Sequence, residues 1–342
     1  MAYNLTGKRI YVAGHGGMVG SAVLHRLRQE NCTILTAESS LDLREQSDVR
    51  QWFATVRPDA VILAAAKVGG IIANRDAPAQ FLQDNLLIAA NVIDAAQSVD
   101  VEKLLFLGSS CIYPRMAAQP IAEEALLSGP LEETNEAYAL AKITGIKLCQ
   151  AYRRQYGCDF ISAMPCNLYG PYDNFDPRTA HVLPALIRKV EEAARNAAPD
   201  LTLWGSGTPL REFLHVDDCA DALIFLLQYY SDEKPVNIGS GEEISIRDLA
   251  EMVCEIAGYY GSLHWDETMP DGTPRKLMDN SRMRKMGWQP HIGLEDGIAA
   301  THRWFRERHG PAALWPVLRK PAHRARARAM VHKASMHQHP IG

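Results

Sequence analysis

The 342-residue sequence lacks the marks of secreted, membrane-spanning and nucleic-acid-binding proteins. Its seven cysteines are an odd number without a Cys-x-x-Cys pair, which argues against a disulfide framework or a zinc site and for free thiols in a reducing compartment. No run approaches the roughly 18 apolar residues of a membrane span, and the first twenty residues do not resemble a signal peptide. The net charge of −4 argues against nucleic acid as the main partner. We therefore expect a cytoplasmic protein that binds neither membrane, nucleic acid nor metal.

Alternating apolar runs and helical patterns indicate an α/β fold. Short apolar runs predict buried parallel strands, and amphipathic or apolar stretches between them predict helices. The expected strands are residues 8–13, 33–36, 59–66, 104–107 and 159–164, and the expected helices include 46–56, 78–99 and 181–197. This pattern predicts a Rossmann-type, doubly wound parallel sheet with a smaller C-terminal substrate-binding lobe.

The domain boundaries follow from a change of composition. After residue 170, prolines become frequent and the segments become shorter and less regular. Residues 1–170 are expected to form a dinucleotide-binding domain to which later segments return, and residues 171–310 are expected to form most of the second lobe. Residues 319–342 contain no acidic residue and little apolar periodicity, which predicts a flexible basic tail.

A glycine-rich turn follows the first expected strand. Gly14, Gly17 and Gly20 have the Gly-x-x-Gly-x-x-Gly spacing of a dinucleotide-binding turn, and a helix is expected to begin at about Ser21. The first glycine permits the turn, the second lets backbone approach a pyrophosphate, and the third lets the helix pack on the strand. The alternative is a glycine-rich turn without function, but the strand before it and the helix after it favour a dinucleotide.

The stretch after the second strand does not decide which dinucleotide binds. A carboxylate there favours the free ribose hydroxyl of NAD, and a basic residue accommodates the phosphate of NADP. Residues 37–43 offer no arginine or lysine before Arg44. Glu38 could repel a phosphate or point to solvent, and the neighbouring serines could bind one. Both NADP(H) and NAD(H) remain open on this ground.

Polar residues follow the buried strand at residues 104–107. Ser109 can hydrogen-bond a substrate oxygen, and Cys111 places a thiol beside it, where parallel strands of an α/β sheet end. Taken alone, these are small residues that fit a strand-to-loop turn. Tyr138 and Lys142 lie four residues apart, so on a helix they share one face. An ammonium group there would favour the phenolate and lower the tyrosine pKa, which suits proton transfer to a sugar oxygen.

Together these motifs resemble the extended short-chain dehydrogenase/reductase family, and within it the enzymes that epimerise and reduce a GDP-linked 4-keto-6-deoxy sugar. The resemblance covers about residues 7–308. It rests on residues 64–70, 107–114, 134–138, 167–171, 204–209, 211–218 and 270–276.

The resemblance implies two catalytic groups of residues. It assigns the reductase triad to Ser109, Tyr138 and Lys142, and the acid/base pair that inverts C3 and C5 to Cys111 and His181. A 4-keto group acidifies the protons on both neighbouring carbons, and thiol and imidazole have ordinary pKa values of about 8.5 and 6.5, near working pH. For His181 taken alone, a structural histidine is the better interpretation.

The resemblance also implies binding residues and partners. The implied cofactor is NADP(H), although the arginines with which some members hold the 2′-phosphate are absent here. The family is homodimeric, which implies that residues 78–99 and the helix carrying Tyr138 pair between subunits. The implied cofactor contacts are Gly14, Gly17, Met18, Val19, Gly20, Asp42, Leu43, Ala64, Ala66, Lys142, Asn167, Leu168 and His181. The implied GDP-sugar contacts are Lys189, Trp204, Arg211, Asp271 and Lys276.

Two alternatives stay open. Another nucleotide-sugar enzyme of the same fold would share most of these motifs; Cys111 with His181 argues against a 4-epimerase or a dehydratase, but not against an enzyme making the related sugar colitose. A dinucleotide-binding scaffold without turnover is the second alternative. Intact Ser109, Tyr138 and Lys142 argue against it, because a binding module has no need of a proton donor beside a lysine.

Overall fold

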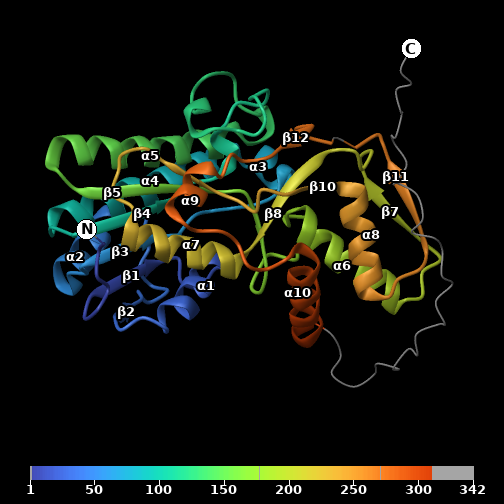
Figure 1. Cartoon of the computed structure of the whole chain (residues 1–342), viewed down its shortest axis with the longest axis horizontal. Helices are drawn as coiled ribbons and strands as arrows, with labels where there is room; N and C mark the ends of the chain where they lie inside the picture. Colours follow the sequence, from blue (N-terminus) through green and yellow to red (C-terminus); the bar gives the residue numbers. More distant parts are fainter. Residues whose placement is uncertain (1, 177, 270, 310–342) are drawn as a thin grey trace, which may run out of the picture.

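A six-stranded parallel sheet forms one half of the molecule (Figure 1). The computed structural model describes residues 2–309 except 177 and 270. The predicted tail lies outside the described residues. The strands run in the order β2-β1-β3-β4-β5-β9, and every neighbouring pair is parallel. Their bounds are β1 Arg9–Ala13, β2 Thr33–Leu35, β3 Ala60–Leu63, β4 Lys103–Leu107, β5 Asp159–Pro165 and β9 Val236–Ile238.

Helices cover both faces of this sheet, as expected for a doubly wound fold (Figure 1). On one face α1 packs against α7, and on the other α4 packs against both α2 and α5. The bounds are α1 Met18–Leu27, α2 Gln46–Val56, α4 Pro78–Ser98, α5 Glu136–Tyr156 and α7 Val216–Tyr229. β1 lies between β2 and β3, so the order of strands reverses there. Open α/β sheets bind ligands at the carboxyl ends of strands at such a reversal.

The central strands are apolar because both of their faces are covered. All five residues of β4 are buried, including Lys103, whose ammonium group donates to Asp159 (2.7 Å) and to the Tyr230 carbonyl (2.6 Å). A buried cation with two oxygen partners avoids the cost of an unpaired charge. α5 approaches β4 closely at Gly145, where an added Cβ would overlap the Phe106 ring. This close approach positions the side chains that α5 presents at the end of β4.

The second half of the molecule has its own apolar core and smaller sheets (Figure 1). β8 pairs with β6, β10 and β12, while β7 pairs with β11. Three helices, α6, α8 and α10, pack beside them. The bounds are β6 Asn167–Tyr169, β7 Asp200–Trp204, β8 Leu210–His215, β10 Glu243–Ser245, β11 Ser262–Asp266, β12 Arg275–Lys276, α6 Val182–Arg195, α8 Ile246–Ala257 and α10 Leu294–His309.

The remaining elements are short. They are α3 Ile71–Asp76, α9 Ser281–Met286 and three 3₁₀ turns at Ser110–Ile112, Glu123–Ala125 and Glu133–Asn135. Two predicted bounds need correction: the third strand ends at Leu63 and α1 begins at Met18. All seven cysteines are free. Within the described part of the chain, no helix has the length and apolar character needed to cross a membrane.

Candidate active site

The glycine turn joins β1 to α1. Gly14 has a φ of +86°, and a Cβ there would come within 2.6 Å of the Ala65 backbone, so only glycine fits. A Cβ at Gly20 would collide with the Gly14 carbonyl oxygen. The third glycine therefore lies inside the first turn of α1, and its role is to let the helix lie against the turn that precedes it.

The start of α1 fits a pyrophosphate. Gly17 is the N-cap residue and supplies no side-chain cap, and the first turn carries no acidic residue. The amides of Met18, Val19 and Gly20 have no acceptor within the helix, and Gly16 and Gly17 are exposed. Free amides and the positive end of the helix dipole favour an anion there. The residues present thus fit the phosphates of a dinucleotide.

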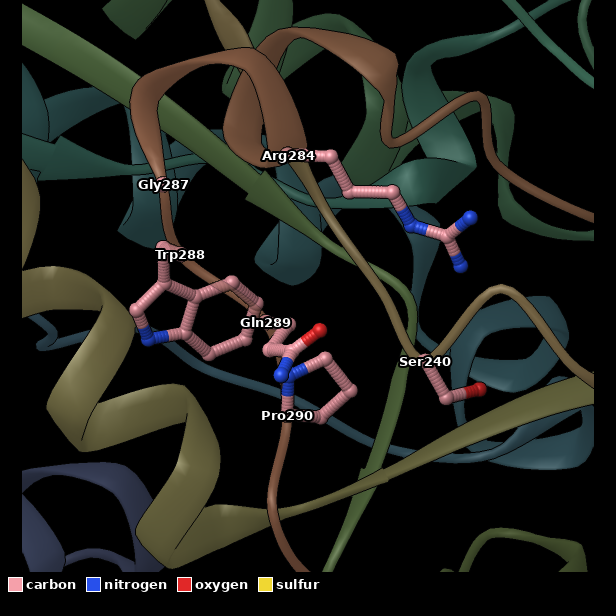
Figure 2. Close-up of a pocket in the computed structure, with 6 residues that line it drawn as sticks. All are labelled: Ser240, Arg284, Gly287, Trp288, Gln289 and Pro290. Carbon is pink, nitrogen blue, oxygen red and sulfur yellow. The ribbon is translucent and has the colours of Figure 1, made fainter.

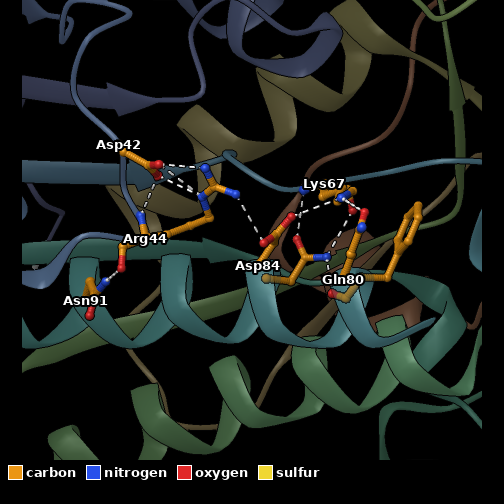
Figure 3. Close-up of polar contacts among 8 residues, drawn as sticks. Asp42, Arg44, Lys67, Gln80, Asp84 and Asn91 are labelled. Carbon is orange, nitrogen blue, oxygen red and sulfur yellow. Dashed lines mark hydrogen bonds and ion pairs between the residues drawn. The ribbon is translucent and has the colours of Figure 1, made fainter. Parts of the chain in front are cut away.

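The other predicted cofactor residues flank this turn. The amide of Ala64 donates to the Ala13 carbonyl (3.0 Å), which brings the end of β3, with Ala66 just beyond it, beside the turn. The segment after β2 is held by Asn91, whose side-chain amide donates to the carbonyls of Leu43 (3.0 Å) and Arg44 (2.8 Å) (Figure 3).

Asp42 and Asn167 each have a partner within the protein. Asp42 forms an ion pair with Arg44, with its shortest contact at 2.6 Å. Asn167 and Leu168 lie on β6, and the Asn167 side chain donates to the Glu212 carbonyl (2.8 Å). Its carbonyl oxygen remains available to a ligand. That these residues contact the cofactor stays a prediction.

Ser109, Tyr138 and Lys142 come together at the end of β4. Ser109 follows the strand and caps the 3₁₀ turn at Ser110–Ile112, while Tyr138 and Lys142 lie in the first two turns of α5. Ser109 hydrogen-bonds Tyr138. The buried Lys142 ammonium group donates to the Leu107 carbonyl (2.7 Å) and lies 5.0 Å from the centre of the Phe106 ring. The predicted triad is therefore assembled in space.

The expected effect of Lys142 on the Tyr138 pKa is wrong for this arrangement. Burial and the neighbouring Cys111 raise the pKa of Tyr138, and only its hydrogen bond with Ser109 lowers it. Burial also lowers the pKa of Lys142 to about 7. The ammonium group is directed at a carbonyl, with the centre of the Tyr138 ring 5.8 Å away. The shared helix face was predicted correctly, but burial dominates both pKa values.

Cys111 and His181 both lie near Lys276. The Lys276 ammonium group contacts the Cys111 sulfur at 3.9 Å, and Lys276 is close enough to His181 to lower its pKa. Burial is the larger cause of that lowering, and it favours the neutral imidazole. That Lys276 lies near phosphates stays a prediction. The two predicted acid/base residues thus share one lysine as a neighbour.

A double glycine at residues 69 and 70, to which the sequence analysis assigned no role in the site, positions His181. The Gly70 amide donates to the Thr179 carbonyl (2.9 Å), and a Cβ at Gly70 would lie 2.6 Å from the Ala180 carbonyl oxygen. His181 follows directly, as the N-cap residue of α6. The adjacent glycines at 69 and 70 are the signal that could have indicated this close approach.

Gly145 and Phe106 were also missed. Gly145 follows Tyr138 by seven residues and Lys142 by three, so all three lie on the same face of α5. The Phe106 ring lies under this face, against both Gly145 and the Lys142 ammonium group. A glycine within a helix at this spacing is a signal of close packing that sequence reasoning could have used.

The predicted sugar-nucleotide residues lie in the second half. Lys189 lies over the half-exposed Trp204 ring, with its nitrogen 5.0 Å from the ring centre. Arg211 on β8 is the register partner of Lys276 on β12, so two cations are adjacent near Cys111. Asp271 accepts from the Ser206 amide and hydroxyl, both at 2.8 Å. An exposed aromatic ring beside cations suits a base and a diphosphate.

A separate pocket lies away from these residues. It is lined by Ser240, Arg284, Gly287, Trp288, Gln289 and Pro290, and has a volume of about 600 Å³ (Figure 2). None of the predicted site residues lines it. We assign it no role.

The fold and the site define a class of enzyme that combines a Rossmann-type dinucleotide turn with a Ser-Tyr-Lys triad. The chain belongs to the NAD dependent epimerase/dehydratase family, whose profile matches residues 10–239. It is 57% identical over 304 residues to the GDP-L-fucose synthase of Sinorhizobium fredii, covering 89% of this chain and 97% of the relative. It is 37% identical to the GDP-L-colitose synthase of Yersinia pseudotuberculosis, covering 87% and 97% respectively.

Solved structures agree with this assignment. The crystal structure of a GDP-L-fucose synthetase from Naegleria fowleri bound to NADP superposes with a TM-score of 0.83 at 30% identity. The superposition covers 90% of this chain and 97% of that one. The predicted family and the predicted Rossmann-type fold are therefore confirmed.

Proposed function

We propose that this chain is a GDP-L-fucose synthase, which inverts C3 and C5 of GDP-4-keto-6-deoxy-D-mannose and then reduces its 4-keto group. The observation that carries the proposal is that Ser109, Cys111, Tyr138 and Lys142 gather at the end of β4, while Lys276 is a neighbour of both Cys111 and His181. The identity of 57% with a GDP-L-fucose synthase supports the choice of substrate.

Epimerisation comes first and uses the residues around Lys276. Cys111, as the thiolate, removes the proton from a carbon beside the keto group, and the electron pair moves onto the keto oxygen as an enolate. His181, as the imidazolium, donates a proton to the opposite face of that carbon and becomes neutral, while Cys111 is left as the thiol. Cys111 then loses its proton to solvent and His181 regains one from solvent before the sequence repeats at the second carbon. Arg211 and Lys276 bring positive charge close to Cys111, and positive charge there stabilises an enolate over the neutral ketone.

Reduction uses the triad. A nicotinamide cofactor, when bound, supplies the hydride to C4. The Tyr138 hydroxyl donates a proton to the oxygen on C4, and Ser109 holds that oxygen by a hydrogen bond. The Lys142 ammonium group donates to the Leu107 carbonyl, which holds this face of α5 against the end of β4. Its remaining N–H groups are offered to the cofactor ribose. The GDP-L-fucose synthetase from Naegleria fowleri binds NADP, and we propose that this chain also accepts NADP(H).

The remaining residues serve binding. We propose that the guanine stacks at Trp204, which is 48% exposed, and that Lys189 and Arg211 bind the diphosphate. Asp271 fixes residues 205–207 of the same site through Ser206. We further propose a cytoplasmic homodimer paired through α4 and α5, which pack together and leave Leu140 exposed. The seven free thiols, one of them catalytic in this proposal, agree with a reducing compartment.

The test is a reaction in deuterium oxide with GDP-4-keto-6-deoxy-D-mannose and NADPH or NADH. Cofactor absorbance reports reduction, and mass spectrometry of the product counts solvent deuterons on carbon. We expect cofactor oxidation with two deuterons in the product. Oxidation of the cofactor without deuterium in the product would mean that the chain is a 4-reductase and does not epimerise the sugar.

Two further outcomes would favour the alternatives. Turnover of a 3-deoxy analogue alone would favour colitose synthesis, for which the 37% identity with a colitose synthase is the supporting observation. Cofactor binding without turnover on any 4-keto sugar would favour a scaffold.

A further inference from the structure

The segment that follows β2 lies beside the glycine turn. β1 and β2 are parallel neighbours with Tyr11 opposite Leu35, so their carboxyl ends meet at one edge of the sheet. A dinucleotide whose pyrophosphate lies at the start of α1 has its adenosine ribose close to that edge. There, a carboxylate accepts from the 2′-hydroxyl of NAD, whereas a cation binds the 2′-phosphate of NADP. The charges after β2 therefore determine which cofactor is favoured.

The edge carries a free carboxylate. Glu38, three residues beyond the end of β2, is exposed, and its side chain has no hydrogen bond or ion pair among the residues that the structure describes. Residues 36–43 contain no lysine or arginine. Ser39 and Ser40 offer only neutral hydroxyl donors, which bind an anion more weakly than a cation does.

Arg44, which follows this segment in the chain, and Lys67, which follows β3, already have partners (Figure 3). The Arg44 guanidinium donates to both oxygens of Asp42, at distances from 2.6 to 3.1 Å, and to Asp84 at 3.3 Å. The Lys67 ammonium group donates to Asp84 (3.0 Å) and to Gln80 (2.8 Å). In this cluster two carboxylates balance two cations, so its net charge is zero. Adding Glu38 makes the edge negative.

This charge balance disfavours a 2′-phosphate. A phosphate monoester carries a charge of about −1.5 to −2 at pH 7. Arg44 already gives three of its five N–H groups to Asp42 and Asp84, and Lys67 gives two of its three to Asp84 and Gln80. A charge-assisted hydrogen bond is typically worth about 10- to 100-fold in affinity, but here a phosphate would have to share each cation with a carboxylate that already neutralises it.

We propose that this enzyme does not select for the 2′-phosphate, because Glu38 and the Asp42–Arg44–Asp84–Lys67 cluster leave the ribose edge without an unpaired cation among the residues that the structure describes. NADH then binds with an affinity within about tenfold of that for NADPH, and either cofactor supports the reaction. The proposal rests on the dinucleotide site of the proposed function, but not on its sugar chemistry.

Direct binding to the full chain tests the proposal without any sugar. NADH and NADPH are titrated separately by calorimetry at pH 8, where histidines are ordinarily neutral, in 0.15 M salt. We expect the two dissociation constants to lie within about tenfold of each other, or NADH to bind more tightly. NADPH binding more than tenfold tighter than NADH overturns the proposal. If neither cofactor binds, the dinucleotide site itself is refuted, whereas binding without turnover refutes only the proposed reaction.

Charge substitutions at position 38 test whether Glu38 is a cause of the lack of selectivity between NADPH and NADH. Glu38→Arg supplies a free cation and is expected to tighten NADPH binding by about 10- to 100-fold while tightening NADH by less than threefold. Glu38→Gln removes only the repulsion and should tighten NADPH by a smaller factor. Glu251→Arg, on an exposed position of α8 in the other half, makes the same charge change and should alter neither affinity. An unchanged ratio of affinities in both Glu38 variants would overturn the assignment of this position.

Discussion

The close packing of α5 on β4 predicts that one methyl group at Gly145 will impair catalysis from a distance. A Cβ at Gly145 would overlap three atoms of the Phe106 ring, two of them at 2.7 Å. Carbon atoms in contact prefer about 3.5–4.0 Å, so helix and strand must separate by about 1 Å. Gly145 lies on the helix that carries Tyr138, and Phe106 lies three residues before Ser109. The separation therefore acts directly on the bond between Ser109 and Tyr138.

The expected magnitudes follow from this geometry. Overpacking a core costs about 1–3 kcal/mol, and replacing glycine by alanine within a helix returns about 1 kcal/mol. Gly145→Ala should therefore lose roughly 0–2 kcal/mol of unfolding free energy, a fall in Tm of up to about 3 °C. A misplacement of about 1 Å at a catalytic group can cost about 100-fold in rate. We expect a loss of that order in the reductive step.

The assay combines thermal unfolding with single-turnover reduction. Gly293→Ala is the matched control, because a Cβ there meets only Asp296, at 3.9 Å, and it should leave both quantities unchanged. Phe106→Leu in the Gly145→Ala background makes room for the methyl group and should recover part of the rate. Wild-type Tm and turnover in Gly145→Ala would refute the reasoning, as would a rate that Phe106→Leu does not improve.

Three further predictions concern the site itself. Tyr138→Phe should abolish reduction while calorimetry still detects bound cofactor; normal turnover would remove Tyr138 from the triad. Cys111→Ser should stop deuterium entering C3 and C5 from solvent, and exchange at the wild-type rate would show that Cys111 is not the base. Burial lowers the pKa of Lys142 from 10.5 to about 7, so between pH 7 and 10.5 the unfolded chain holds more protons and stability rises with pH. The unfolding free energy should therefore rise by roughly 4–5 kcal/mol over that window in the wild type, and this rise should be absent from Lys142→Met in denaturant titrations at several pH values. The same dependence of unfolding free energy on pH in both proteins would contradict the prediction.

Local spacing predicted those parts of the site that are close in sequence. The glycine turn, the order of strand and helix, and the shared face of Tyr138 and Lys142 all follow from periodicity and spacing. The six-residue α3 was missed because it is too short to show a helical period. The contact of Lys276 with Cys111 joins residues 165 positions apart, and no local pattern indicates such a pairing. The pKa values of Tyr138 and Lys142 depend on burial, which only the packed structure determines.

One short turn links the two halves of the proposed reaction. Ser109 Oγ accepts a hydrogen bond from the Cys111 amide (3.2 Å) and also bonds Tyr138, so one hydroxyl orients both the thiol and the proton donor. The thiol in turn meets Lys276 from the second half of the molecule. In the proposed reaction both sets of residues act on one sugar ring, so the ring need not leave the site between inversion and reduction. A 4-keto intermediate held there keeps its acidic carbons within reach of Cys111 and His181 until hydride transfer removes the keto group, and with it the acidity that epimerisation needs.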